Sequence, residues 1–103
     1  MQRVVELSKI MSDINRVRIL TLILRDKELC VCEICDTLEL SQPLVSRHLK
    51  QMKEVKVLDS NKRGKWMIYT LISSPDSILL CFIDKLQKKV DSLPKLIVCE
   101  SFT

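Results

Sequence analysis

Residues 41–52 read Ser-Gln-Pro-Leu-Val-Ser-Arg-His-Leu-Lys-Gln-Met. The Ser41 hydroxyl is a favourable N-cap, and Pro43 falls in the first turn of a helix, where its missing N–H costs little. Apolar side chains then recur at helical spacing and form one stripe: Val45, Leu49 and Met52. The stretch therefore predicts an amphipathic helix over about residues 42–54, with one face on a core and a polar face outward.

The outward face of this helix carries side chains that suit DNA recognition. Arginine can contact guanine through two hydrogen bonds, glutamine can contact adenine, and serine suits bases or phosphates. A helix N-terminus also favours phosphate. The candidate DNA-contacting residues on this helix are Gln42, Ser46, Arg47, His48 and Lys50. A merely solvated helix face has the same pattern, so the neighbouring segments must decide between the two interpretations.

Those neighbours complete a DNA-binding motif. Two strand-like runs lie within residues 57–71, and the basic link between them holds Gly64, where a hairpin turn needs a positive φ. The candidate DNA-backbone contacts on this hairpin are Lys62, Arg63 and Lys65. A short helix expected from about residue 31 to residue 38 precedes the recognition helix. The order of elements is typical of a helix-turn-helix followed by a wing.

Helices are also expected on both sides of this motif. Two precede it, and a last helix is predicted over about residues 76–93. The last helix has an apolar face broader than one small domain can cover: Ile78, Phe82, Ile83, Leu86 and Val90. We therefore expect a mainly α fold with a small β-hairpin wing. It would be a single winged helix-turn-helix domain over residues 1–103 that forms a homodimer through the last helix.

The composition agrees with a globular DNA-binding protein. Apolar residues make up 47 % and charged residues 29 % of the chain, and the formal net charge of +4 permits an anionic partner. The apolar runs are too short to span a membrane, and no signal-peptide pattern is visible. We expect a cytoplasmic protein without a membrane partner.

Three of the five cysteines crowd into one short segment: Cys30, Cys32 and Cys35. An odd number of cysteines with this crowding is a poor disulfide framework, and in a reducing compartment it favours metal binding or redox chemistry. Three thiolates without a nearby histidine suit a soft acceptor. Structural zinc usually takes four ligands instead.

Helical geometry constrains this cluster. At about 100° per residue, Cys32 and Cys35 lie about 60° apart, whereas Cys30 lies about 160° from Cys32. Either Cys30 lies before the helix, or the first turn unwinds when all three sulfurs bind one atom. The helix N-terminus is expected to favour the thiolate form. Cys35 could equally be a small apolar side chain packed in the core. Cys81, which lies on an apolar helix face, is expected to pack there. Cys99 is expected to be either a free thiol or a residue that folds back onto the site.

Four stretches carry a family pattern. They are Ser12-Asp13 with Arg16, Ile19 and Leu20; Glu28 through Glu33; Ser41-Gln42-Pro43 through Ser46-Arg47-His48-Leu49; and Gly64-Lys65-Trp66 with Tyr69 and Leu71. Together they resemble the ArsR/SmtB family of metal-responsive repressors, in particular its arsenic-sensing members.

The resemblance implies a homodimer joined through the first and last helices. It implies a repressor that binds double-stranded operator DNA, at an inverted repeat, and dissociates when arsenite or antimonite binds. It assigns Cys30, Cys32 and Cys35 as trigonal ligands of the inducer, As(III) or Sb(III), with no cofactor in the DNA-bound form. It assigns DNA reading to Gln42, Ser46, Arg47 and His48.

Departures from the family pattern narrow the choice of metal. Zinc sensors that resemble SmtB use Asp and His ligands on the last helix, and here that helix has Asp76 and Asp84 but no histidine. Cadmium and lead sensors add cysteines from an N-terminal extension, and this chain has none before Cys30. Arsenic or antimony is therefore expected, while Cys99 leaves cadmium or lead as an alternative.

Two other interpretations use the same thiols. A thiol-redox enzyme would use Cys32 and Cys35 as a C-x-x-C pair, but such enzymes place the pair beside a βαβ unit, and no parallel strands are predicted here. A redox-responsive repressor would keep the winged-helix fold and oxidise the thiols. We expect a binding protein and not an enzyme.

Overall fold

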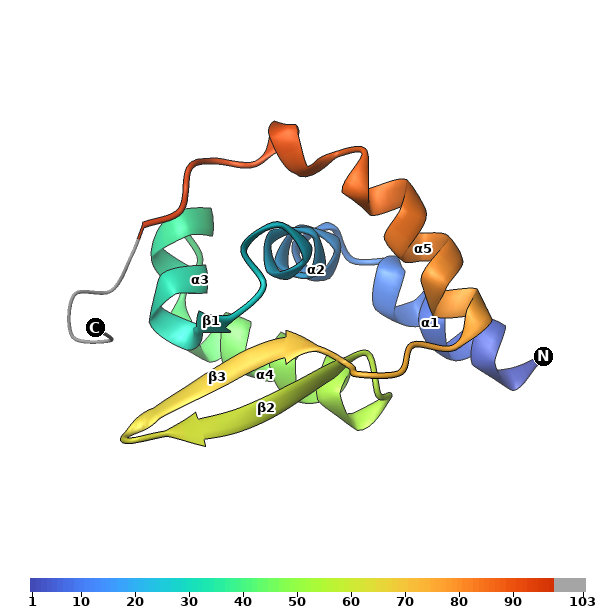
Figure 1. The fold of residues 1–103 in the computed structure, drawn as a ribbon, viewed down its shortest axis with the longest axis horizontal. Coiled ribbons are helices and arrows are strands. Elements are labelled where there is room, and N and C mark those ends of the chain that lie inside the picture. Colours follow the sequence, from blue (N-terminus) through green and yellow to red (C-terminus); the bar gives the residue numbers. More distant parts are fainter. Residues whose placement is uncertain (98–103) are drawn as a thin grey trace.

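The computed structural model describes residues 1–97 of the chain, and Cys99 lies outside the described residues. The elements are α1 (Gln2–Met11), α2 (Ile14–Asp26), β1 (Leu29–Cys30), α3 (Val31–Leu38), α4 (Gln42–Glu54), β2 (Leu58–Arg63), β3 (Trp66–Leu71), α5 (Ser77–Gln87) and a 3-10 turn (Val90–Ser92). Five helices and a small sheet form a winged helix-turn-helix, as expected (Figure 1).

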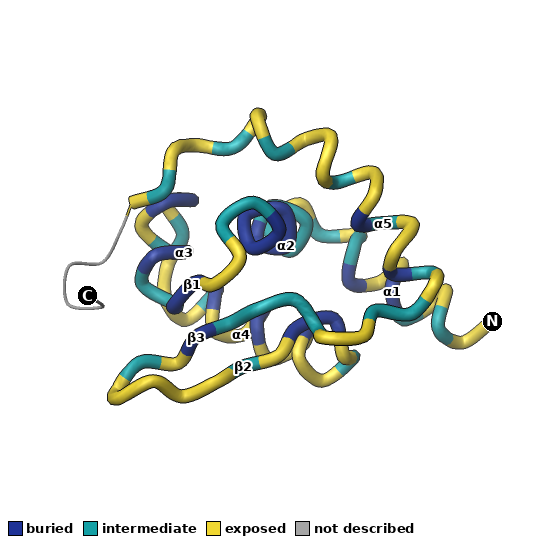
Figure 2. The backbone as a smooth tube through the Cα atoms, in the orientation of Figure 1, coloured by how far each residue is buried: buried dark blue, intermediate teal, exposed yellow. Residues whose placement is uncertain are grey.

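Helix α2 occupies the centre of the fold. Six consecutive residues, 19–24, are buried, and the tube in Figure 2 is dark blue over part of this helix. Asp13 starts the helix because its carboxylate accepts hydrogen bonds from the backbone N–H groups of Asn15 and Arg16, at 2.8 and 3.4 Å. The other helices and the sheet pack around this buried segment.

Helices α3 and α4 form the helix-turn-helix. The Ser41 hydroxyl accepts a hydrogen bond from the Leu44 N–H at 3.4 Å, which confirms the predicted N-cap of α4. The predicted inward stripe is confirmed as well, because Val45, Leu49 and Met52 are fully buried. Between the helices, Glu39 adopts a left-handed conformation with φ +56° and ends α3.

The sheet has three strands instead of the two that were predicted. Its order is β1-β3-β2, and both pairings are antiparallel. The hairpin turns at Gly64, whose φ is +63°, as the hairpin turn requires. The additional strand β1 pairs Leu29 with Tyr69 and Cys30 with Ile68, so the segment that carries Cys30 is fastened to the wing.

Helix α5 is shorter than predicted. It ends at Gln87 instead of continuing to residue 93, and the 3-10 turn follows. The chain's own core also uses much of the expected dimer face, since Ile83 is buried and Ile78, Phe82 and Leu86 pack against the core. The apolar side chains still exposed on α1 and α5 are Val4, Val5 and Leu80. Among the described residues, no helix is long and apolar enough to cross a membrane.

Candidate functional site

Cys30 lies before α3, which is the first of the two alternatives left open by helical geometry. It is the N-cap residue of α3, with an extended backbone, and its N–H donates to the Glu33 carboxylate at 3.1 Å. Because Cys30 does not follow the rotation of the helix, its sulfur meets that of Cys32 at 3.6 Å. The geometry of α3 therefore does not keep these two sulfurs apart.

The two thiols whose titration is perturbed lie in an apolar environment. Cys30 is only 1 % exposed, and burial raises the pKa of its thiol despite the opposing effect of the Glu33 N–H. Burial, assisted by the Asp36 carboxylate, also raises the pKa of the Cys35 thiol. The expectation that the helix end favours thiolate is therefore wrong for Cys30 and Cys35, because desolvation by burial outweighs the backbone hydrogen bonds that favour the charged form.

Cys35 does not complete a preformed site with the other two cysteines. It is half-buried and packs against the hydrophobic core. Within residues 1–97, no group of three His, Cys, Asp or Glu side chains lies close enough to hold a metal ion. A three-thiolate arrangement therefore needs a shift of Cys35 or of the α3 segment that carries it.

A cavity of about 280 Å³ lies beside the sulfur pair. Cys30, Val31 and Cys32 line one side, at the beginning of α3. Gln42 from α4 and three residues of the wing line the other side: Lys65, Trp66 and Met67. The Lys65 ammonium lies 5.7 Å from the centre of the Trp66 ring, within cation–π range. The cavity thus joins the cysteine segment, the first residue of α4 and the wing.

Seven of the eight predicted DNA-contacting residues are exposed. On α4 they are Gln42, Ser46, Arg47 and Lys50. On the hairpin they are Lys62, Arg63 and Lys65. The two groups lie on α4 and on the neighbouring hairpin, and both are exposed to solvent.

His48 differs from the other predicted contacts. It is only 5 % exposed, and within residues 1–97 neither ring nitrogen makes a hydrogen bond. Its Nε2 lies 4.0 Å from the Asp13 carboxylate. Burial lowers the pKa of the imidazole, although Asp13 opposes this effect. The structure thus corrects the expectation that His48 faces DNA, because the helix turns its ring toward the start of α2.

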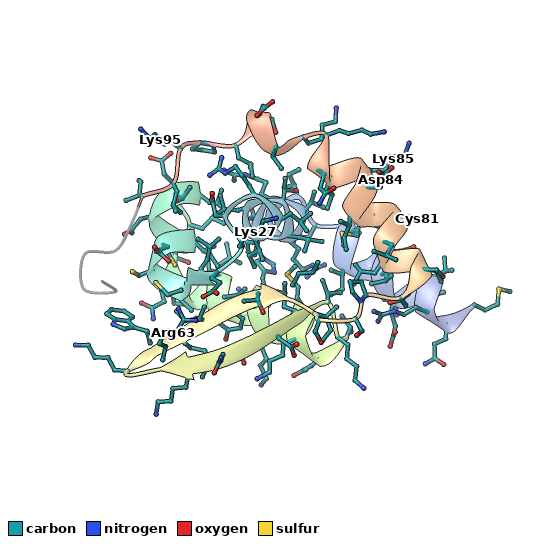
Figure 3. The ribbon with its side chains drawn as sticks, in the orientation of Figure 1. Lys27, Arg63, Cys81, Asp84, Lys85 and Lys95 are labelled. Atoms are coloured by element: carbon teal, nitrogen blue, oxygen red, sulfur yellow. The ribbon has the colours of Figure 1, made fainter. Side chains whose placement is uncertain are left out.

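Arg63 links the wing to the cysteine segment. Its guanidinium donates to the Glu28 carboxylate at 2.7 Å, two residues before Cys30 (Figure 3 labels Arg63). Together with the β1–β3 pairing, this contact gives the wing two connections to the segment that begins the thiol pair. The sequence analysis predicted neither connection. The β1–β3 pairing was missed because a two-residue strand shows no alternating pattern.

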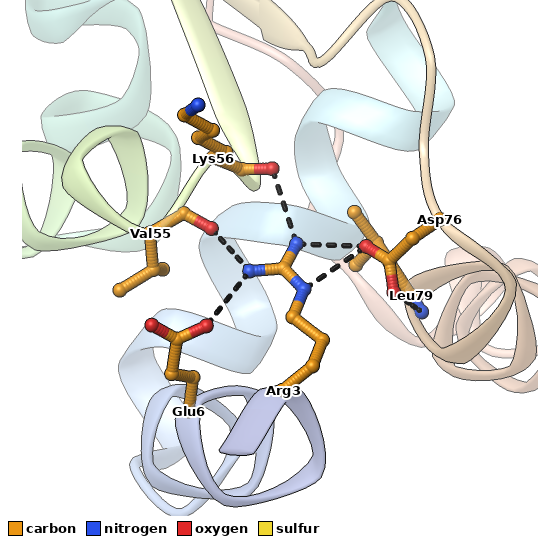
Figure 4. Close-up of polar contacts among 6 residues, drawn as sticks. All are labelled: Arg3, Glu6, Val55, Lys56, Asp76 and Leu79. Atoms are coloured by element: carbon orange, nitrogen blue, oxygen red, sulfur yellow. Dashed lines mark hydrogen bonds and ion pairs between the residues drawn. The ribbon is translucent and has the colours of Figure 1, made fainter. Parts of the chain in front are cut away.

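Arg3 forms a second connection that the sequence analysis missed. Its guanidinium donates to Asp76, the N-cap of α5, at 2.8 and 3.0 Å. It also donates to the backbone carbonyls of Val55 and Lys56 at the end of α4 (Figure 4). Arg3 thus joins α1, α5 and the end of the recognition helix.

The remaining sequence-predicted residues lie apart from the thiol site. Cys81, expected to pack, is exposed on α5 (Figure 3). Asp84 is exposed on the same helix, whereas Asp76 is engaged by Arg3.

Residues 13–59 match the family model described as "Bacterial regulatory protein, arsR family". HlyU from Vibrio cholerae superposes with a TM-score of 0.74 at 31 % identity, covering 85 % of this chain and 91 % of that one. The chain belongs to the arsR family of bacterial regulatory proteins. The predicted winged helix-turn-helix fold, and a regulatory rather than enzymatic class, are thereby confirmed.

Two curated relatives of this arsR-family protein are named for resistance to different elements. The arsenic resistance transcriptional regulator ArsR1 of Pseudomonas putida is 48 % identical over 61 % of this chain and 49 % of its own length. The cadmium resistance transcriptional regulatory protein CadC of Listeria innocua is 41 % identical over 59 % of this chain and 51 % of its own length. The chain spans about half the length of these curated relatives.

Proposed function

We propose that this arsR-family protein is a dimeric transcriptional repressor of operator DNA that is released by trivalent arsenic or antimony. The inducer binds Cys30, Cys32 and Cys35. The observation that carries the proposal is the 3.6 Å separation of the Cys30 and Cys32 sulfurs. With metal–sulfur bonds of about 2.3 Å, as for zinc, two thiolates at this distance can share one atom. The similarity to an arsenic resistance regulator supports the choice of ligand.

The chemistry of capture is an exchange of ligands without oxidation. Arsenite carries three hydroxyl groups on arsenic. Each thiol forms an As–S bond, its proton leaves with a hydroxyl group as water, and arsenic remains trivalent. Three cysteines therefore replace three oxygens, and thiolate ligands suit a soft acceptor. Buried thiols favour such a ligand because it removes their protons without leaving a charge in the apolar site.

The DNA contacts divide into two kinds. Gln42, Ser46 and Arg47 on the exposed face of α4 would read base edges in the major groove. Lys50 and the wing side chains of Lys62, Arg63 and Lys65 would contact the phosphate backbone. His48 is left out of this set because its ring is buried.

Ligand capture weakens DNA binding only if the ligand favours a conformation that binds DNA poorly. Bringing Cys35 to the Cys30–Cys32 pair would displace α3, which packs directly before the recognition helix. The same segment pairs with β3, so the wing would move as well. Coupling between two sites is typically about 1–3 kcal/mol, or roughly a 5- to 150-fold loss of operator affinity.

Cysteine substitutions test the proposed trigger. Cys30→Ser and Cys32→Ser should each bind operator normally but stay bound when arsenite is added, because each variant lacks one sulfur of the pair. Cys35→Ser should need more arsenite than the unsubstituted protein. Gel shifts with increasing arsenite on reduced protein measure these responses. Cys81→Ser, exposed on α5, is the matched control and should be released normally. If Cys32→Ser left the operator at the ordinary arsenite concentration, the trigger would be refuted.

A cadmium-responsive repressor is the second candidate, favoured by the similarity to a cadmium resistance regulator. Cadmium would need ligands beyond the sulfur pair. Titration with Cd(II) and with arsenite, each followed by operator release, separates the two. A redox-responsive repressor would instead show a persistent disulfide by mass spectrometry in a cytosolic thiol buffer. One arsenic per reduced chain would oppose that alternative.

A further inference from the structure

Arg16 connects the end of α1 to the recognition helix through all three nitrogens of its guanidinium. Its Nε donates to the Ile10 carbonyl at 2.8 Å, and its Nη2 donates to the Lys9 carbonyl at 2.9 Å. Both carbonyls lie in the last turn of α1, where helix carbonyls commonly lack partners within the helix. The remaining Nη1 donates to the Gln51 Oε1 on α4 at 2.8 Å. Arg16 therefore fastens the end of α1 to the side of α4.

Arg3 fastens the start of α1 to the same part of α4. Its guanidinium donates to the carbonyls of Val55, the C-cap of α4, and of Lys56 (Figure 4). Gln51 and Val55 are about one helical turn apart, whereas Arg3 and Lys9 lie about 9 Å apart along the axis of α1. One anchor would let α1 pivot, but two separated anchors restrict both its rotation and its displacement relative to α4.

A cavity of about 270 Å³ lies between α1 and α4, next to these anchors. Its lining includes Glu6 and Lys9 from α1 and Glu54 from α4, besides Arg16 and Gln51. Protein interiors fix the separation of two helices when close-packed side chains fill the space between them. Here a cavity takes that space, so the separation of α1 and α4 over this stretch depends on the hydrogen bonds of the two arginines.

Helix α1 also carries two apolar side chains, Val4 and Val5, that are about half exposed. In a two-fold dimer that covers them, α1 of one protomer contacts its partner. The position of each recognition helix relative to the two-fold axis then depends on how α4 is held against α1. A dimer reads an inverted repeat only when the distance between its recognition helices matches the spacing of the half-sites.

We propose that Arg16 and Gln51 are a positioning pair that sets the half-site spacing read by the dimer. This inference rests on the proposed function, but it concerns the recognition of DNA and not the inducer. Together with Arg3, the pair holds α4 against α1, so that two recognition helices stand at a fixed separation. Loss of the pair leaves each recognition helix intact and lets their separation vary.

The first experiment compares a full inverted repeat with a single half-site by fluorescence anisotropy. The repeat is selected from random DNA with the unsubstituted protein. Gln51→Met removes the acceptor of Arg16 without a change of charge, and Gln51 is exposed, so the variant should fold. Its affinity for the repeat should fall roughly tenfold, the scale of one hydrogen bond to a charged group, while its half-site affinity should stay within about twofold. An equal loss on both DNAs would overturn the inference.

The second experiment changes the spacer between the half-sites by one base pair in either direction. The unsubstituted protein should prefer the selected spacing, and both Gln51→Met and Arg3→Gln should reduce this preference because α4 is held less strictly. Glu54→Gln is the matched control, since Glu54 lines the same cavity. Its lost negative charge raises the affinity for every sequence alike, so the spacing preference should be unchanged. An unchanged preference in Gln51→Met would contradict the proposal.

A double-mutant cycle tests whether the two residues act as a pair. Gln51→Met should have little further effect on repeat affinity in an Arg16→Met background, because the shared hydrogen bond is already lost. Arg16→Lys keeps the charge without the planar guanidinium, so it should retain only part of the affinity for the repeat. Circular dichroism checks that each variant folds. Additive effects of the two substitutions would show that the residues act independently.

The outcomes keep the inference and the proposed function apart. If no inverted repeat is selected and the protein is a monomer, both fail. If arsenite releases the operator but Gln51→Met keeps the spacing preference, the proposed function stands and the inference fails. If the pair sets the spacing but the operator stays bound in arsenite, the inference stands and the proposed induction fails.

Discussion

At the level of single residues, the position of His48 on α4 causes its side chain to be buried, although its chemical type would suit a contact with DNA. Its neighbour Arg47 is exposed, yet one step along the helix the imidazole is buried against the start of α2. Asp13, which caps α2, is the acidic group facing the ring, while Arg16 and Arg47 oppose a positive charge there. The net effect is a neutral, buried histidine.

His48 makes stability depend on pH. Since burial lowers its pKa in the folded state below the ordinary 6.5, the unfolded chain binds the proton more readily. Its stabilising effect is therefore present above about pH 6.5 and is lost as the pH falls below it. Urea unfolding at pH 7.5 and pH 5.5 should show this loss, and His48→Asn should reduce it. An equal pH dependence in the variant would contradict this role.

Arg47 carries the prediction for specific recognition. If it reads a base, Arg47→Ala should weaken operator binding by about 1–3 kcal/mol and leave non-specific binding less affected. Lys62→Ala, on the wing, should weaken binding to all sequences and reduce the salt dependence. Fluorescence anisotropy with operator and scrambled DNA at several salt concentrations measures both. Unchanged operator affinity in Arg47→Ala would exclude α4 as the reading helix in the proposed register.

At the scale of elements, the short strand β1 determines what the cysteine segment can influence. Its pairing with β3 places Cys30 in the sheet of the wing, while the same residue caps α3. The Glu28–Arg63 ion pair adds little stability, because both side chains are about half exposed and such surface pairs contribute about 0–1 kcal/mol. Its importance is geometric, since it holds the hairpin beside the thiol segment.

Arg3 is the corresponding connection on the other side of the fold. Its bonds to Asp76 and to the Val55 carbonyl join α5 to the end of α4. Arg3→Gln should lower the free energy of unfolding by about 1–2 kcal/mol, because charge-assisted bonds in a partly buried site are lost. Urea denaturation measures this change. Arg3→Lys keeps the charge without the planar guanidinium, so its free energy of unfolding should lie between those of the other two proteins. If Arg3→Gln were as stable as the unsubstituted protein, Arg3 would not stabilise the junction of α4 and α5.

At the scale of the whole molecule, the exposed apolar side chains on α1 and α5 predict a dimer. Val4, Val5 and Leu80 are each about half exposed, and the two helices that carry them pack together (Figure 1). A two-fold dimer would place its recognition helices roughly 34–36 Å apart, or a multiple of that spacing, to match an inverted repeat.

Leu80→Glu tests this surface. The new charge should favour the monomer, because it would be desolvated in the interface, and operator affinity should fall as the second half-site is lost. Sedimentation at micromolar concentration measures the assembly. Ile97→Glu is the matched control, since Ile97 is also 50 % exposed but lies beside Thr37 of α3. A monomeric unsubstituted protein, or a dimeric Leu80→Glu, would contradict the proposed interface.

Features that depend on local interactions could be predicted from the residues alone. The Ser41 cap, the stripe on α4 and the turn at Gly64 were predicted because each follows from residues within one or two turns of chain. The three cysteines were selected as a candidate site for the same reason, since their crowding is visible without a fold. Helical spacing also showed that Cys30 must leave the helix or the helix must unwind.

Which of these groups meet, and which are buried, depends on how distant segments pack in the fold. This packing placed Cys30 before α3 and beside Cys32, raised the pKa of Cys30 by enclosing it, and turned His48 inward. In the structure, α5 is also shorter than predicted, and β1 pairs with β3. These outcomes depend on segments that lie far apart in the chain. Burial and strand pairing arise only when distant surfaces pack together, so no local pattern specifies them.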